Sequence, residues 1–116
     1  MKSENNIDKE MIANNLSPFE PTHPGELIKE EIEFRELSQS TLAKQMGMSY
    51  KVLNDIVNQR RPITTTTALL FEAALSISAD LLIQVQIKYN IYLANQDKTF
   101  AQRLAEIRKA VSAAAI

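Results

Sequence analysis

Residues 38–58 contain the feature that most narrows the possible folds, a pair of short helical segments with a glycine between them. Ser38 and Ser49 each stand directly before one of the segments, and serine is a preferred N-cap residue. Gly47 ends the first segment, where glycine adopts the left-handed conformation without strain. Two short helices joined by so tight a turn form a helix-turn-helix.

Four further positions in this window fit the packing that a helix-turn-helix needs. Ala43 is small at the point where the second helix of the pair crosses the first. Met48, Leu53 and Ile56 are apolar and placed to hold the crossing angle from beneath. Because few random helical pairs satisfy all of these demands together, we predict a functional helix-turn-helix here.

Apolar spacing and capping residues predict four more helices and no sheet. The helix that starts near His23–Glu26 is expected to pack through Leu27, Ile28, Ile32 and Phe34. The fourth helix, capped by Thr64, is apolar nearly all round and is therefore expected to be largely buried. The six predicted helices are one from about 23 to 34, then 39–46, 50 to about 58, 65 to about 75, 79 to about 93, and a last one opened by a capping box at Thr99–Gln102.

The chain is therefore expected to be all-α, with three parts. Residues 1–21 are polar, contain Pro18 and Pro21, and read as a flexible N-terminal arm. Residues 22–93 form the helix-turn-helix domain of about five helices. Residues 94–116 form an additional C-terminal helix, a candidate for dimerisation or partner binding.

Composition excludes several classes of chemistry. The 116 residues include no cysteine, one histidine and two glycines, so thiolate sites, multi-histidine metal centres and glycine-rich phosphate loops are not expected. His23 is expected to serve the start of a helix. We expect no catalytic residue, metal or cofactor, and hence no enzyme. Without a signal peptide or a long apolar run, we also expect a cytoplasmic protein away from the membrane.

The net charge of −1 conceals an uneven distribution of charge. Residues 35–61 carry five basic and two acidic side chains, whereas residues 1–34 carry three basic and eight acidic ones. Local charge decides phosphate contact better than net charge does. The basic segment lies on the helix-turn-helix and favours nucleic acid, while the acidic segment favours a basic protein partner.

In a helix-turn-helix the start of the second helix enters the major groove of DNA. Tyr50, Lys51, Asn54 and Asp55 are therefore expected to face base edges, where lysine reads guanine, asparagine reads adenine and aspartate reads cytosine. Asp55 has an alternative as a solvated helix charge, and Tyr50 has one as a residue packed against the arm. Backbone phosphates are expected at Gln39 and at the two arginines that follow the helix. The candidate DNA-binding residues are Gln39, Ser49, Tyr50, Lys51, Asn54, Asp55, Arg60 and Arg61.

The ordered motifs resemble the phage-repressor/Cro (XRE) superfamily and, within it, the HigA-type (VapI-like) antitoxins. The matching residues are Leu37-Ser38-Gln39, Leu42-Ala43, Gly47-Met48-Ser49, His23-Pro24-Gly25-Glu26, Asn58 to Thr64, Ala68-Leu69, Ser78-Ala79, Gln86 and Tyr89. The resemblance implies a lambda-repressor-like fold and a homodimer that binds double-stranded operator DNA and represses its own promoter. It also implies neutralisation of a HigB-type toxin, a ribosome-dependent messenger-RNA endonuclease.

This chain departs from the pattern of that branch at several positions. Gln59 and Ser76 stand where glycine is usual, Leu70 replaces an arginine, Leu82 a tryptophan and Asn90 an aspartate. The departure at Leu82 removes an aromatic anchor for the fifth helix. The helix-turn-helix itself is unaffected.

Two other functions remain compatible with these residues. One is a stand-alone repressor of the phage type without a toxin partner, and the other is a protein-binding inhibitor whose helix-turn-helix no longer contacts DNA. A dimer is expected in the DNA-binding cases because one helix-turn-helix buries too little DNA for a tight specific complex. The apolar stripe of the last helix is the candidate interface, formed by Phe100, Leu104, Ile107 and Val111.

Overall fold

The structure is a computed structural model that describes residues 20–114, and in this range it contains six α-helices and no strand. The predicted fold class, all-α with a helix-turn-helix and an extra C-terminal helix, is confirmed. Most of the predicted arm, residues 1–19, lies outside the described residues, as do residues 115–116. The helices are α1 (Pro24–Phe34), α2 (Gln39–Met46), α3 (Tyr50–Val57), α4 (Thr65–Leu75), α5 (Ala79–Gln96) and α6 (Lys98–Ala114).

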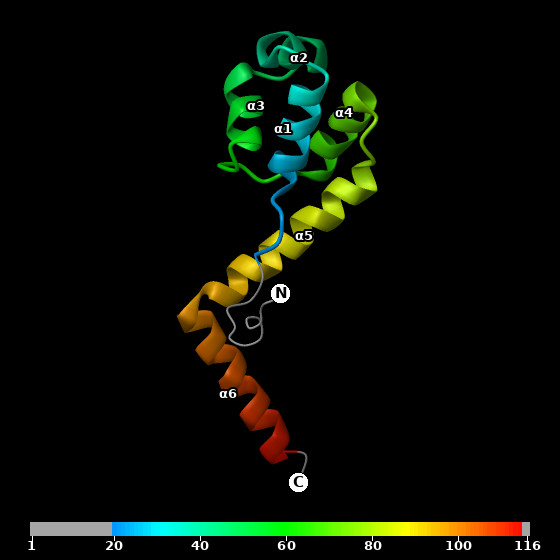
Figure 1. Ribbon diagram of the computed structural model, residues 1–116. Helices are drawn as coiled ribbons and strands as arrows, with labels where there is room; N and C mark the ends of the chain where they lie inside the picture. Colours follow the sequence, from blue (N-terminus) through cyan, green and yellow to red (C-terminus); the bar gives the residue numbers. More distant parts are fainter. Residues whose placement is uncertain (1–19, 115–116) are drawn as a thin grey trace, which may run out of the picture.

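Helices α1 to α4 and the start of α5 enclose the core (Figure 1). Its largest fully buried side chains include Phe71, Ile28, Leu53 and Leu82, which come from four different helices. Leu82 is completely buried although it is not an aromatic anchor, so α5 docks on the bundle through an aliphatic side chain. The helix-turn-helix, α2 and α3, therefore rests on a continuous apolar layer.

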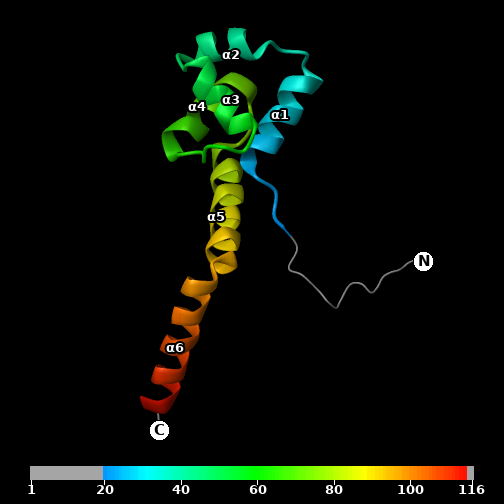
Figure 2. The same ribbon diagram turned by 90° about the vertical axis from the view of Figure 1, so that its left-hand side faces the viewer.

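The second half of α5 and all of α6 extend away from this bundle (Figures 1 and 2). The radius of gyration is 19.2 Å, against the roughly 13 Å of a compact domain of about 100 residues. None of the residues of α6 is buried. In the described part of the chain, no helix is long and apolar enough to cross a membrane.

The predicted caps determine where the helices begin. Ser38, Ser49, Thr64 and Ser78 each accept a hydrogen bond from a backbone N–H in the first turn of the helix that follows. Gly47 ends α2 with φ of 67°, as expected. The amide of Met48 donates to the carbonyl of Ala43 over 2.9 Å, which closes the tight turn into α3.

Two expectations about buried faces were wrong. Phe34 is 84% exposed because it lies two residues after Ile32, which places it on the opposite side of α1 from the core. Helix α4 buries only Ala68, Phe71 and Leu75, and it leaves Leu69 and Leu70 partly in solvent. An all-apolar sequence hides which face a helix uses, since its composition carries no periodic signal.

The start of the last helix also differs from the prediction. Helix α5 runs to Gln96 instead of about Leu93, and α6 begins at Lys98. Asp97 Oδ1 accepts a hydrogen bond from the amide of Phe100 over 3.1 Å, so Asp97 caps α6. The capping box expected at Thr99–Gln102 is therefore wrong, because Thr99 already lies within the first turn.

The N-terminus of α1 packs closely against the end of α3. His23 is the N-cap of α1, and its Nδ1 accepts a hydrogen bond from the amide of Gly25 over 2.9 Å. The His23 ring also packs edge-on against Tyr89 of α5, with 4.8 Å between ring centres. A β-carbon on Gly25 would overlap the carbonyl oxygen of Ile56 in α3. The expectation that His23 serves a helix start is confirmed.

We predict that Gly25→Ala unfolds the protein more readily than Gly47→Ala does. The first change forces α1 away from backbone atoms of α3, which cannot move as a side-chain tip would, so we expect a loss of about 3 kcal/mol or more. The second meets no atom within 4 Å and costs about 1–2 kcal/mol for its positive φ. Urea unfolding measures both, and equal losses would contradict the close contact at Gly25.

We also predict that the free energy of unfolding falls as pH drops below about 6.5, the ordinary pKa of histidine. Burial lowers the pKa of His23 below its usual 6.5, although Glu26 opposes the shift. The folded state therefore favours neutral His23, and its contribution is complete above pH 6.5 and lost as pH falls below it. The sequence has one histidine, so His23→Asn, which retains a capping oxygen, should remove this difference in the free energy of unfolding. An unchanged pH dependence in the variant would rule out His23 as its source.

Candidate nucleic-acid interface

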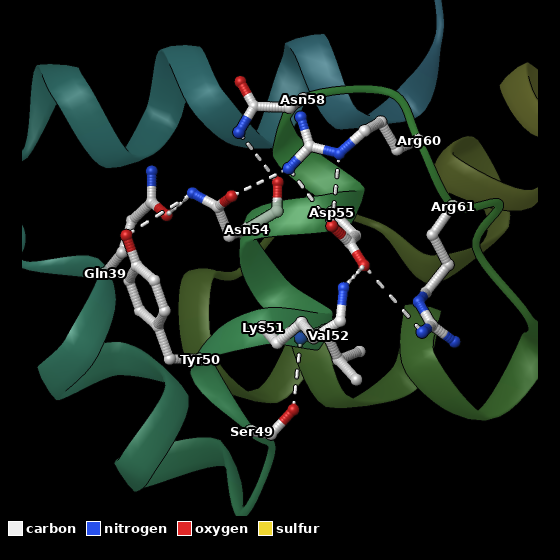
Figure 3. Close-up of polar contacts among 10 residues, drawn as sticks. All are labelled: Gln39, Ser49, Tyr50, Lys51, Val52, Asn54, Asp55, Asn58, Arg60 and Arg61. Atoms are coloured by element: carbon white, nitrogen blue, oxygen red, sulfur yellow. Dashed lines mark hydrogen bonds and ion pairs between the residues drawn. The ribbon is translucent and has the colours of Figure 1, made fainter.

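The exposed face of α3 forms the centre of the candidate interface (Figure 3). Leu53, Ile56 and Val57 are buried beneath it, and this fixes which side of the helix remains outside. Ser49 Oγ accepts a hydrogen bond from the amide of Val52 over 3.1 Å and so defines the first turn. The unpaired N–H groups and positive end of that turn suit a phosphate.

Asn54 lies at the middle of a polar network on this face. Its Nδ2 donates to Gln39 Oε1 over 3.3 Å and to the Tyr50 hydroxyl over 3.4 Å. Its Oδ1 accepts a hydrogen bond from Arg60 Nη2 over 2.9 Å. The network fixes the orientation of the Asn54 amide and connects the first residue of α2 to the segment that follows α3 (Figure 3).

Asp55 brings three basic side chains together. Its Oδ2 lies 3.1 Å from Lys51 Nζ and 3.9 Å from Arg61 Nη2, and its Oδ1 lies 3.1 Å from Arg60 Nη2. The hydrogen bond from Lys51 is the main cause that lowers the pKa of Asp55, with a further contribution from Arg60 against the opposing effect of burial. Asp55 is therefore an anion at the base of a cationic cluster.

The backbone after α3 places Arg60 beside this anion. Gln59 has φ of 64°, its amide donates to Ile56 O over 3.0 Å, and the amide of Arg60 donates to Asp55 O over 2.7 Å. This pair of bonds is a Schellman motif, built here around a residue other than glycine. The usual cost of a left-handed non-glycine residue is about 1–2 kcal/mol.

A buried side chain of α5 holds the rest of the connector, the segment 58–64 between α3 and α4. Gln86 Oε1 accepts a hydrogen bond from the amide of Ile63 over 2.8 Å, and Gln86 Nε2 donates to Asn90 Oδ1 over 2.9 Å. Gln86 is 5% exposed, so this contact anchors the connector from inside the fold. Its supporting role was missed at the sequence level, where Gln86 contributed only to the family resemblance.

Seven of the eight candidate residues form one connected cluster, made of Gln39, Tyr50, Lys51, Asn54, Asp55, Arg60 and Arg61. Ser49 lies outside it and caps α3. The alternative that Asp55 is a solvated helix charge is wrong, since the residue is only 9% exposed. Its reading of cytosine stays a prediction, as does the packing of Tyr50 against the arm.

Another basic residue of the segment has a structural role instead. Arg35 Nη2 donates to the carbonyl of Leu75 over 2.6 Å, at the C-terminal end of α4, and Arg35 Nε pairs with Glu31. A cation at this end of a helix satisfies free carbonyl groups. Of the other four basic residues of the segment, Lys51, Arg60 and Arg61 gather around Asp55, whereas Lys44 is exposed on α2. Among the described residues, no group of three acidic, histidine or cysteine side chains is placed to bind a metal.

Comparisons with known proteins agree with this geometry. A helix-turn-helix family model matches residues 28–82, which include α2 and α3. The virulence-associated protein I of Dichelobacter nodosus is 36% identical over 77 residues, which cover 66% of this chain and 71% of that protein.

Solved structures of two HigA proteins have the same architecture. An addiction module antidote protein of the HigA family from Coxiella burnetii is 28% identical, with a TM-score of 0.66 over 76% of this chain and 95% of that one. The Pseudomonas aeruginosa antitoxin HigA, solved with the higBA promoter, is 28% identical, with a TM-score of 0.62 over 66% of this chain and 84% of that one. The chain belongs to the HigA/VapI-like family of XRE-type helix-turn-helix antitoxins.

Proposed function

We propose that this protein is a cytoplasmic antitoxin that binds double-stranded operator DNA, represses its own operon and neutralises a HigB-type toxin. The observation that carries the DNA-binding part is the cluster around Asn54 and Asp55, which places three cations and three neutral polar side chains on the exposed face of the recognition helix α3. The P. aeruginosa HigA structure with the higBA promoter supports this role.

Two kinds of DNA contact are expected from the cluster. Lys51 is on the first turn of α3, with 81% of its side chain exposed, and is placed to donate to guanine O6 and N7 in the major groove. Arg61 is farther along the connector, and its Nη2 lies 3.9 Å from Asp55, the longest of the three ion-pair distances. Because this pair is loose, Arg61 is available to a backbone phosphate. Gln39, at the first turn of α2, is placed for a second phosphate.

The acidic side chains of α1 support a basic protein partner. Glu26, Glu30 and Glu33 line one exposed hollow of about 340 Å³ together with Lys29. This hollow is at α1 and at the end of α3, and its residues are separate from the DNA-contacting set. Co-purification of this chain with the product of the neighbouring reading frame would support toxin binding. A chain that binds its promoter but no such product would instead be a stand-alone repressor.

We propose that two copies associate through the extended C-terminal part. In α5 Ile87 and Ile91 are 50% and 56% exposed, and in α6 Ile107 and Val111 are 50% and 63% exposed. These residues recur at intervals of four, so each pair lies on one helix face. Apolar stripes of this kind mark interaction surfaces, and a second copy also supplies a second recognition helix.

We predict different effects of Lys51→Ala and Arg61→Ala on DNA binding. Loss of Lys51 should weaken binding to the operator by about 1–3 kcal/mol and relax the preference at one base pair. Loss of Arg61 should weaken binding to operator and random duplexes alike and reduce the salt slope by about 1. Fluorescence anisotropy titrations at several salt concentrations measure both quantities.

Exposed Lys29 offers the control for the DNA experiment. It is on α1 outside the cluster, so Lys29→Ala removes the same charge and should leave the salt slope nearly unchanged. Equal losses for Lys51→Ala on operator and random duplexes would remove Lys51 from base readout. Failure of the wild-type chain to bind any duplex at low salt would contradict the proposed function and favour the protein-binding inhibitor.

For the dimer, we predict that Leu104→Asp with Ile107→Asp gives a monomer. Two buried carboxylates would cost more than the apolar contact returns, so the dimer should dissociate. Light scattering measures the mass, and the same changes at the exposed positions Gln102 and Ala105, which lie away from the stripe, serve as a control. A dimer that persists in the first variant places the interface elsewhere.

A further inference from the structure

We propose that Asp55 is a positioning residue for sequence recognition, which holds Lys51 and Arg60 over the exposed face of α3 so that both read base edges. The proposal rests on the DNA-binding function above. It moves Arg60 from the backbone contact expected from the sequence to a base-reading role.

The first support is the difference in exposure within the cluster. Only 13% of the Asp55 side chain is exposed, against 81% for Lys51 and 59% for Arg60. The carboxylate is thus behind the two cations, and it contacts each within 3.2 Å. An anion in this place orients charged donors while remaining shielded from phosphates by the cations in front of it.

The second support is the direction that Asp55 gives to Arg60. Arg60 Nε and Nη2 both donate to Asp55 Oδ1, over 3.2 Å and 3.1 Å, and Nη2 also donates to Asn54 Oδ1. These bonds fold the arginine back over α3, the helix that enters the groove, and away from the outward direction of the connector (Figure 3). A planar guanidinium fixed through Nε and Nη2 can still donate from Nη1 to an acceptor at little further cost in entropy.

The third support is that the backbone brings both cations close to Asp55. The amide of Arg60 donates to the carbonyl of Asp55, which places the Arg60 side chain beside the carboxylate. Lys51 is one helical turn before Asp55, on the same face of α3. Two cations from different segments therefore converge on one carboxylate by short-range constraints. Asp55 itself has both oxygens engaged, which leaves it poorly placed to accept from cytosine as well.

The test is Asp55→Asn, measured as a ratio of two affinities. The probes are the duplex that the wild-type protein selects from a randomised pool and a scrambled duplex of the same length. Removal of one negative charge by itself strengthens binding to both duplexes equally. If Asp55 positions the readers, the ratio of selected to scrambled affinity falls about tenfold, and binding to the scrambled duplex is maintained or increased.

Glu36→Gln is the matched control. It removes one negative charge from the same basic segment, at an exposed position outside the cluster, and should leave the ratio unchanged. Thermal melting of both variants confirms that each is folded.

A double-mutant cycle separates positioning from simple stabilisation. In an Arg60→Ala, Lys51→Ala background, Asp55→Asn should have no further effect on the ratio, because the groups it orients are absent. An unchanged ratio in Asp55→Asn, or an equal fall in both backgrounds, overturns the proposal while the DNA-binding function stands. A wild-type protein that selects no sequence overturns both.

Discussion

The contact between Gly25 and the carbonyl of Ile56 is the constraint on which the rest of the structure depends. It sets α1 directly against the backbone of α3 with no side chain between them, so the recognition helix has a fixed distance from the first helix. His23 fixes the same end of α1 by capping the helix and by packing against Tyr89 of α5. The position of α3 relative to α1 follows from the contact at Gly25.

The polar face of α3 depends in turn on a single buried anion. Without Asp55, Lys51, Arg60 and Arg61 would repel one another across a short distance, and their long side chains would sample many rotamers. The carboxylate makes their proximity favourable. This explains how a chain with a net charge of −1 presents a compact cationic surface: the acidic side chains of α1 face elsewhere, and the one acid within the interface organises its cations.

Local signals in the sequence predicted most of the fold and the membership of the site. Serine and threonine caps, Gly47 and the apolar periodicity are short-range features, and they determine helix starts within a residue or two. Features that depend on three-dimensional neighbours were not accessible. The sequence does not show that Gly25 abuts α3 or that Asp55 is surrounded by cations from two segments. Asp97 was overlooked for a different reason, since a stronger capping pattern began two residues later.

The extended C-terminal part of the chain, α5 and α6, has a geometric consequence. A helix rises about 1.5 Å per residue, so the 18 residues of α5 and the 17 of α6 each span roughly 26 Å. In a dimer joined through α5 and α6, the lengths of these helices and the bend at Asp97 set the separation of the two recognition helices. Half-sites must then be spaced to match. The operator period would be encoded in helices that never touch a base, and a change in the bend at Asp97 would retune the target site without altering a single DNA contact.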